Sequence, residues 1–291
     1  MLKEWRDVVG CPYCCGVLES PDGDGGVLRC RDCGERFAVE GRIPVLVRRE
    51  DAGRLAQFAR EYQEARLQDG WQRLTAERAR ALPYGQPPGY PPLYWEVRRQ
   101  SFCALMSLMA REGPSPAAGP AADVGAGIGW LSYRLAQLGY RMATVEASRD
   151  TAFGLGAAEQ YYASEVPFLP VQGDLNHLPL QHGKLGLVIF NASLHYAVDL
   201  ERTLQRSAQA LRRGGRLIVL DTPISRHPRP GTGQGDRHLS RRELQAALVK
   251  AGLRPRWIEV RRGLRWWSHQ LKAWLRRDPT FSFPMIAADR T

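Results

Sequence analysis

The chain has 291 residues, of which 44% are hydrophobic and 24% charged, and its formal net charge is +11. This length suits one domain of ordinary size with a small appendage, and the hydrophobic fraction is enough to build a sizeable core. No apolar run reaches the roughly 18 residues that a membrane-spanning helix needs, and residues 1–7 lack the apolar stretch of a signal peptide. We therefore expect a cytoplasmic protein whose six cysteines stay reduced.

Two pairs of cysteines mark the first 49 residues. Cys11 and Cys14 form one pair, and Cys30 and Cys33 form the other, in the pattern C-x2-C-x15-C-x2-C. Two such pairs can place four thiolates at the corners of a tetrahedron, which is the geometry of structural zinc sites. A segment of about 50 residues also has too small a core to fold alone, so a bound metal ion would supply the missing folding free energy. We therefore predict a zinc ribbon over residues 1–49, with these four cysteines as ligands.

A helical connector is expected to follow, over residues 50–118. Apolar residues recur at helical spacing within residues 50–82 and again within 94–111. Segments rich in proline and glycine follow both helices, and such segments rarely form regular elements. Asp69-Gly70 is expected to interrupt the first helix. The connector should therefore consist of helices joined by irregular turns.

Strand and helix patterns alternate through the remaining residues, 119–291. The expected strands are 121–124, 141–146, 166–171, 186–191, 215–221, 255–261 and 282–288. The expected helices lie near 129–138, 149–163, 199–212, 240–251 and 264–276. Alternation of this kind predicts an α/β fold whose parallel sheet is covered by helices on both faces. Pro167 and Pro170 cannot donate hydrogen bonds to a neighbouring strand, so the third strand is expected at an edge of the sheet.

A glycine-rich turn follows the first of these strands. Gly125, Gly127 and Gly129 come after Asp123 and open a helix, and glycines let the backbone approach a ligand closely because they have no Cβ. The dinucleotide fingerprint would require glycine at position 130, where this chain has Trp130. Asp123 would also repel the pyrophosphate of a nicotinamide cofactor, whereas its carboxylate suits a ligand with an ammonium group. The turn therefore favours a ligand other than a dinucleotide.

The next strand ends at Glu146, where a carboxylate can accept hydrogen bonds from both hydroxyls of a ribose. The glycine turn resembles motif I of class I S-adenosylmethionine-dependent methyltransferases of the type 11 group, and Glu146 resembles the acidic residue that follows this motif. The later motifs of that family resemble residues 172–179, 185–196 and 211–221 of this chain. The resemblance covers residues 121–221 closely and residues 240–289 loosely.

This resemblance implies a fold and a cofactor site. The fold would be a Rossmann-like, seven-stranded methyltransferase sheet with helices on both faces, formed by residues 119–291, with the last strand antiparallel. S-adenosylmethionine would bind over Gly125–Gly129, with Asp123 near its amino acid part and Glu146 on its ribose. The expected cofactor-binding set is completed by Asp174, which would contact the adenine amine, and by Leu175 and Asn191.

The loop from Asn191 to Tyr196 should face the acceptor of the methyl group. His195 is the candidate general base, because the unperturbed pKa of histidine lies near neutrality. Tyr196 is the candidate for orienting the acceptor. The alternatives are that His195 only makes structural hydrogen bonds and that Tyr196 only packs. The loop lacks the Asn/Asp-Pro-Pro-Tyr/Phe signature of adenine-N6 methylation, which counts against that reaction.

The ribbon adds a second resemblance. Residues 30–46 are similar to small zinc-ribbon proteins that partner and activate RNA and protein methyltransferases, and to the ribbon that opens bacterial 23S rRNA guanine-N1 methyltransferases. Such a ribbon can bind RNA or only support the catalytic domain. Residues 1–50 carry eight basic and nine acidic residues, and this near-neutral charge favours support.

Positive charge is concentrated near the C-terminus. Residues 201–277 contain 19 basic and five acidic residues, which favours a local anionic partner. Within them, residues 261–277 predict a helix that combines basic residues with tryptophans. Three interpretations remain open for this basic helix: packing on the sheet, contact with nucleic acid through stacking, or contact with an anionic membrane surface.

Taken together, these patterns predict a methyltransferase that uses S-adenosylmethionine and a structural zinc ion, with a small molecule as the expected acceptor. The first alternative is methylation of an rRNA or tRNA base, with the ribbon recognising the RNA. An alternative from another class is a non-catalytic binding or activator protein with a methyltransferase fold. The complete set of Asp123, the turn glycines and Glu146 counts against that last alternative.

Overall fold

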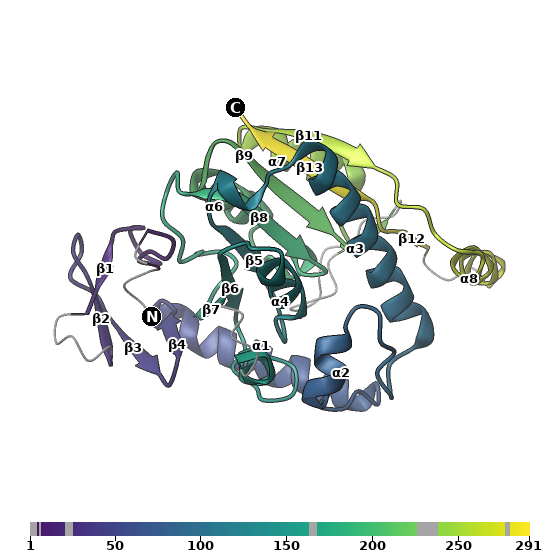
Figure 1. Ribbon diagram of the computed structural model, residues 1–291, viewed down its shortest axis with the longest axis horizontal. Coiled ribbons are helices and arrows are strands. Elements are labelled where there is room, and N and C mark those ends of the chain that lie inside the picture. The colour runs from purple at the N-terminus through teal and green to yellow at the C-terminus, as the bar shows by residue number, and fades with distance from the viewer. Residues whose placement is uncertain (1–4, 6, 21–25, 163–167, 226–237, 277–279) are drawn as a thin grey trace.

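A computed structural model describes residues 5, 7–20, 26–162, 168–225, 238–276 and 280–291. Within these residues, the fold is built on one eleven-stranded sheet with helices packed around it (Figure 1). A separate pair of short strands joins β10 (Ile224–Ser225) to β12 (Phe281–Ser282). No helix among the described residues is both long enough and apolar enough to cross a membrane.

Seven strands of the large sheet form the predicted methyltransferase core. In spatial order these are β7 (Phe168–Gly173), β6 (Met142–Glu146), β5 (Ala121–Val124), β8 (Leu185–Asn191), β9 (Leu211–Leu220), β13 (Met285–Arg290) and β11 (Leu253–Ile258). The first five run parallel, and β13 runs antiparallel between β9 and β11. This arrangement confirms the predicted fold class and the predicted direction of the last strand.

The central strands are apolar because both of their faces are covered. Every residue of β5 and β6 is buried, as expected for parallel strands that lie between two layers of helices. The covering helices include α4 (Trp130–Gln137), α6 (Leu200–Ala210) and α7 (Arg241–Lys250). The hydroxyl of Ser240 accepts a hydrogen bond from the backbone N–H of Glu243 at 3.1 Å, which fixes the start of α7.

One predicted helix forms only in part. Residues 149–163 were expected to be a single helix, but the described part is a turn, a short 3-10 helix η3 (Leu155–Ala158) and α5 (Glu159–Tyr162). The carboxylate of Asp150 accepts hydrogen bonds from the backbone N–H groups of Ala152 and Phe153 at 2.8 and 2.7 Å. Such local capping competes with helical hydrogen bonding and delays the start of the helix.

The predicted edge position of β7 is wrong at its carboxyl end. β4 (Ile43–Leu46) pairs with β7 in parallel, with Val45 opposite Gln172 and Leu46 opposite Gly173. Pro170 lies before this pairing begins, so its missing N–H does not obstruct β4. Pro167 lies outside the described residues.

The ribbon extends the sheet and shares its core. Each of its strands pairs antiparallel with the next one along the chain, in the order β1 (Leu18–Glu19), β2 (Val27–Cys30), β3 (Arg36–Glu40) and β4. Trp5 and Phe37 of the ribbon belong to the same apolar cluster as Val145 and Leu169 of the sheet. The ribbon therefore packs directly on the core of the larger sheet, while its predicted supporting role remains a prediction. The division into 1–49, 50–118 and 119–291 remains a prediction.

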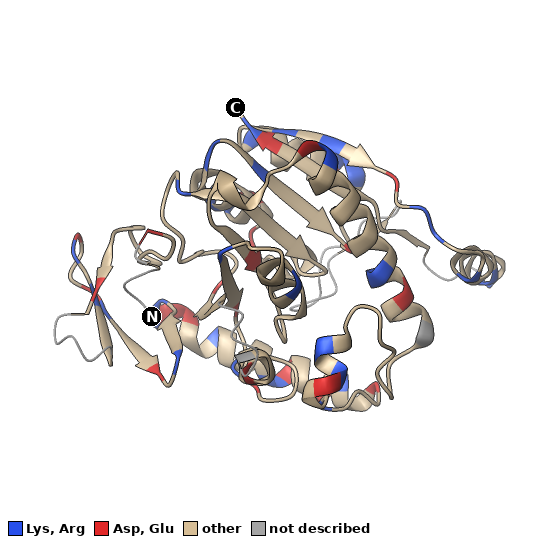
Figure 2. Ribbon diagram, in the orientation of Figure 1, with Lys and Arg blue, Asp and Glu red and all other residues tan. Residues whose placement is uncertain are grey.

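The connector consists of α1 (Arg49–Gln68), α2 (Ala76–Ala81) and α3 (Pro92–Glu112). Aromatic residues of this segment, Trp71 and Trp95 among them, share a second apolar cluster with Trp130 and Leu131 of α4. At the far end of the molecule from the ribbon, α8 (Leu264–Leu275) stands beyond α3 (Figure 1). The ribbon of α8 has blue Lys and Arg positions in Figure 2, and Leu264–Leu275 contains no Asp or Glu.

Candidate active site

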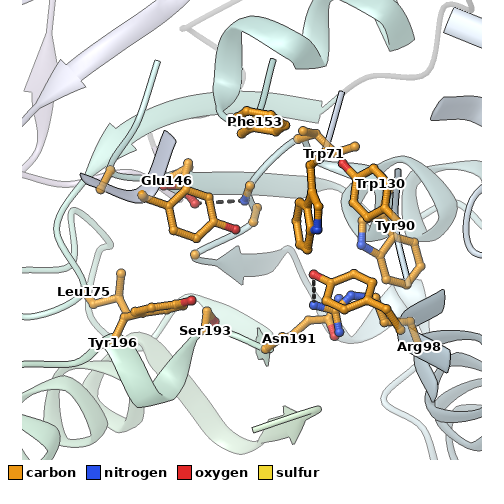
Figure 3. A pocket seen from close by; sticks show the side chains of 18 of the residues that line it. Trp71, Tyr90, Arg98, Trp130, Glu146, Phe153, Leu175, Asn191, Ser193 and Tyr196 are labelled. Atoms are coloured by element: carbon orange, nitrogen blue, oxygen red, sulfur yellow. Dashed lines mark hydrogen bonds between the residues drawn. The ribbon is translucent and has the colours of Figure 1, made fainter. Parts of the chain in front are cut away.

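A cavity opens where the central strands end. It has about 850 Å³ of space free of protein atoms, the open solvent at its mouth included. Its lining comes from the glycine turn after β5, from the end of β6, from the segment after β8, and from α1 and α3. Figure 3 shows Glu146, Leu175 and Tyr196 on one side of the cavity and Trp71, Tyr90 and Arg98 on the other.

The glycine turn lines the cavity with backbone. Gly125 and Gly127 both have positive φ, +69° and +55°, which side chains with a Cβ rarely adopt. A Cβ at Gly125 would also lie 2.4 Å from the Cβ of Ser193. Ser193 holds this position because its hydroxyl donates to the carbonyl oxygen of Val124 at 2.5 Å. Gly129 also has a positive φ, but it is the N-cap residue of α4 and does not line the cavity.

Glu146 connects β6 to the glycine turn. Its carboxylate accepts hydrogen bonds from the backbone N–H groups of Gly127 at 2.8 Å and Ser148 at 3.0 Å. Burial raises the pKa of Glu146, and these N–H donors oppose that rise. The side chain also lines the cavity, and its predicted contact with a ribose remains a prediction.

The two predicted aspartates lie behind the cavity wall. Asp123 is buried and accepts a hydrogen bond from the hydroxyl of Ser132 at 2.9 Å, while its Oδ1 has no hydrogen-bond partner among the described residues. Burial raises the pKa of Asp123 to about 7. Asp174 bonds to Arg54 of α1 and to Asn176. Neither aspartate lines the cavity, so their predicted contacts with the cofactor remain predictions.

Leu175 and Asn191 do line the cavity. Asn191 ends β8, and the next residue, Ala192, adopts φ +55° with its N–H bonded to the carbonyl oxygen of Leu220 at 2.8 Å. This left-handed residue turns the chain sharply, and the turn carries Ser193 under Gly125. Both predicted cofactor contacts are therefore placed where a ligand can reach them.

The two predicted catalytic residues differ in their placement. Tyr196 lines the cavity and packs edge-on against Phe58 and Tyr62 of α1, with ring centroids 5.6 and 6.0 Å apart. His195 lies outside the lining, and burial together with the charge of Arg98 lowers its pKa to about 3. A histidine with this pKa takes up a proton poorly at neutral pH, which argues against the role of general base.

The connector supplies seven of the lining residues, none of which the sequence pattern assigned to the site. Its aromatic contributors are Phe58, Tyr62, Trp71, Tyr90, Tyr94 and Trp95. The ring centroid of Trp71 lies 4.3 Å from that of Tyr90 and 4.8 Å from that of Tyr94. Phe58 and Tyr62 stand four residues apart on one face of a helix, a spacing that signals only a packed face.

A buried cation also belongs to this wall. Arg98 of α3 lines the cavity with a side chain that is 12% exposed, and its guanidinium stacks on the ring of Tyr94 at 3.8 Å and donates to the Tyr94 hydroxyl. Its Nη1 lies 3.8 Å from Asp221, which also lies 3.7 Å from Arg262. Two buried cations therefore share one buried carboxylate.

The four cysteines of the ribbon converge. The Sγ atoms of Cys11 and Cys33 are 3.6 Å apart, those of Cys14 and Cys30 are 3.4 Å apart, and all four lie within 4.8 Å of one another. A tetrahedral zinc site with Zn–S bonds of about 2.3 Å has S–S separations of about 3.8 Å. The four thiols therefore fit a zinc ion.

A second group of candidate ligands has a different explanation. Asp51, Asp174 and His177 lie close together, but Arg48 and Arg54 lie against the same three side chains. The Nδ1 atom of His177 is 2.9 Å from Asp51. The arginines balance the charge of the two carboxylates, so this group acts as an ion-pair network that fastens α1 to the catalytic core.

Comparisons with known proteins agree with this geometry. Residues 122–219 match a family model described as a methyltransferase domain. Over 176 residues the chain is 28% identical to a malonyl-[acyl-carrier protein] O-methyltransferase of Geobacter sulfurreducens, and the match covers 55% of this chain and 64% of that protein, slightly under two thirds of its length.

Solved structures show the same fold. The geranyl diphosphate C-methyltransferase of Streptomyces coelicolor A3(2), solved with S-adenosyl-L-homocysteine, has a TM-score of 0.53 and 21% identity, covering 76% of this chain and 92% of that one. An S-adenosylmethionine-dependent methyltransferase of Mesorhizobium loti has a TM-score of 0.50 and 18% identity, covering 66% and 98%. These structures show that the chain has the fold of class I methyltransferases, and the family match over residues 122–219 identifies a methyltransferase domain within it.

Proposed function

We propose that the protein transfers a methyl group from S-adenosylmethionine to a small acceptor that carries a carboxylate. The observation that carries this proposal is Arg98, a buried cation in the cavity wall. Leaving a buried charge without sufficient compensation is strongly unfavourable. An anionic acceptor group would provide the negative charge that the shared carboxylate of Asp221 supplies only in part.

The polar groups beside Arg98 suit such an anion. The hydroxyl of Tyr94 accepts a hydrogen bond from Arg98, so its own proton is available to a second acceptor. A guanidinium also matches the planar geometry of a carboxylate better than an ammonium group does. Around these two donors the wall is aromatic, which suits an acceptor whose remaining part is apolar.

Apart from Glu146, which the proposal assigns to the cofactor, the ionisable side chains among the described lining residues are tyrosines and Arg98, and this set favours a carboxylate as the nucleophile. Burial raises the pKa of Tyr196 to about 12, and His195 has a low pKa and lies behind the wall. A carboxylate is already deprotonated at neutral pH, so its oxygen requires no base before it takes the methyl group. The name of the Geobacter relative refers to O-methylation of a malonyl group, which is a carboxylate of this kind.

The cofactor would occupy the side of the cavity formed by the glycine turn. Glu146, Leu175 and Asn191 would hold it. Bound there, S-adenosylmethionine would supply a methyl group activated by its sulfonium. The protein would contribute alignment of the acceptor through Arg98 and Tyr94, and exclusion of water through the aromatic wall.

We further propose that a zinc ion bound by Cys11, Cys14, Cys30 and Cys33 has a structural role. The spacing of the Sγ atoms supports this proposal. A site with four protein ligands is closed to substrate. The ribbon would then stabilise the catalytic core through β4.

The experiment compares matched acceptors. Purified protein is incubated with S-adenosylmethionine carrying a labelled methyl group and with pairs of acceptors that differ only as free acid and amide, a malonyl thioester included. We expect methyl esters from acids and no product from the amides. Equal transfer to both members of each pair would refute the carboxylate proposal. Label in RNA would favour the RNA alternative, and failure to bind the cofactor would favour a non-catalytic protein.

A further inference from the structure

An apolar stripe that no other described residue covers runs along α8. Five of its residues, Leu264, Trp267, Leu271, Trp274 and Leu275, are between 57% and 89% exposed. They make up half of the ten exposed large hydrophobic residues found in the described part of the chain. Single exposed apolar residues are ordinary on protein surfaces, but a contiguous group marks a site of interaction.

The stripe has the geometry of a helix face. With about 100° per residue, its five members fall within an arc of roughly 100°. Arg265, Lys272 and Arg276 form a second arc beside it, and residues 260–276 contain no Asp or Glu. The remaining side of the helix faces the protein, where Trp266 packs edge-on against Phe283 at 5.3 Å and Ala273 is buried.

The start of α8 is firmly held. Arg262, two residues before the helix, donates hydrogen bonds to the carbonyl oxygens of Val97 and Phe283 at 2.8 and 2.7 Å and to the hydroxyl of Ser101 at 3.0 Å. Val97 and Ser101 belong to α3, which also carries Arg98. The helix is therefore fixed to the core at one end, while its apolar stripe faces away from the core.

We infer that α8 docks on the surface of an anionic lipid bilayer, with its tryptophans and leucines in the interfacial region. A helix that places Trp and Leu on one face and Arg and Lys beside them is the kind that lies in the plane of such an interface. Its 12 residues give a length of about 18 Å. Because α8 stands at the periphery of the molecule, a flat surface can reach it (Figure 1).

Charge distinguishes this occupant from a second copy of the chain. Symmetric pairing of two such helices would bring Arg265, Lys272 and Arg276 of one copy near the same residues of the other, and like charges repel. An anionic bilayer instead attracts each of these side chains. The inference is independent of which acceptor the cavity takes.

The test uses the full-length protein and vesicles of phosphatidylcholine with and without phosphatidylglycerol, at about 0.15 M salt. We expect flotation with the anionic vesicles and little with the neutral ones. Each interfacial Lys or Arg contributes about 1 kcal/mol, so the variant R265Q/K272Q/R276Q should bind about 150-fold more weakly. The variant W267A/W274A should lose both affinity and the quenching of tryptophan fluorescence by brominated lipids.

Two matched controls separate the helix from general effects. R73Q/R111Q/R213Q removes three exposed arginines elsewhere, and L67A/V249A truncates two exposed apolar residues elsewhere. Both controls should bind as the wild type does, and all variants should keep its melting temperature because the altered side chains are exposed. Absent binding, equal binding to both vesicles, or equal losses in the controls would overturn the inference. A dimer that W267A/W274A dissociates, without vesicle binding, would assign the stripe to a second copy instead.

Discussion

Replacing Arg98 by Met tests how the cavity selects its acceptor. Methionine keeps much of the length and apolar stem of the side chain but removes the guanidinium that faces the cavity. A hydrogen bond to a charged partner contributes about 1.5–3 kcal/mol, which corresponds to about a 10- to 150-fold loss of kcat/KM for an anionic acceptor. Arg262 remains within 4 Å of Asp221, so the buried carboxylate keeps one cation and the fold should survive.

The assay compares kcat/KM for a free acid and its amide in the wild type, in Arg98→Met and in Arg99→Met. Arg99 is exposed on the same helix and serves as the matched control. We expect the wild type and Arg99→Met to prefer the acid strongly, and Arg98→Met to lose that preference while its affinity for S-adenosylmethionine stays unchanged. If Arg98→Met retains the full preference for the acid, Arg98 does not bind the acceptor.

Three further predictions concern the cofactor site and the ribbon. Glu146→Ala should weaken binding of S-adenosylmethionine by about 2–4 kcal/mol in calorimetry, because two charge-assisted hydrogen bonds to the ribose are lost; unchanged affinity would contradict the ribose assignment. In the ligand-free protein, burial raises the pKa of Asp123 from 3.8 to about 7. Between these pH values the folded state therefore binds more protons than the unfolded state. The contribution of Asp123 to the free energy of unfolding should then fall as pH rises from about 4 to 7. Asp123→Asn should remove that contribution in denaturant titrations at several pH values, and equal pH slopes for both proteins would refute it. Protein purified without added zinc should contain about one equivalent per chain, and Cys30→Ser should lower both the zinc content and the melting temperature; a metal-free wild type that is fully folded would contradict the ribbon site.

The sequence was sufficient to predict the core of the fold and the turn that lines the cavity. Buried strands such as β5 read as apolar runs, and the glycines of the turn are required by backbone conformation and by the contact of Gly125 with Ser193. Features of this kind are local, so a short stretch of sequence specifies them. The convergence of the four cysteines is also predictable from local sequence, because their spacing alone indicates it.

Features that depend on distant segments were beyond the sequence pattern. Arg98 and Asp221 are 123 residues apart, and only the packing of α3 against the end of β9 brings them together. The contact between Arg54 of α1 and the carboxylate of Asp174, which stays a predicted cofactor ligand, likewise joins residues that are far apart in the sequence. The loop position of His195 was visible in the sequence, whereas the burial that lowers its pKa was not.

The pairing of β4 with β7 also depends on segments that are far apart in the sequence. Prolines in the third strand of the core argued for an edge, and no local signal showed that the ribbon would add a strand beyond them. The ribbon could therefore be predicted as a zinc site, while its contribution to the catalytic sheet required the tertiary structure.

Calorimetric titration of the wild-type protein with S-adenosylmethionine is the decisive measurement for a methyltransferase. We expect saturable binding of one molecule per chain, similar binding of S-adenosylhomocysteine, and no binding of a nicotinamide dinucleotide, because Trp130 follows the glycine turn and Asp123 lies beneath it. Folded protein that binds neither S-adenosylmethionine nor its demethylated product would not be a methyltransferase of this kind.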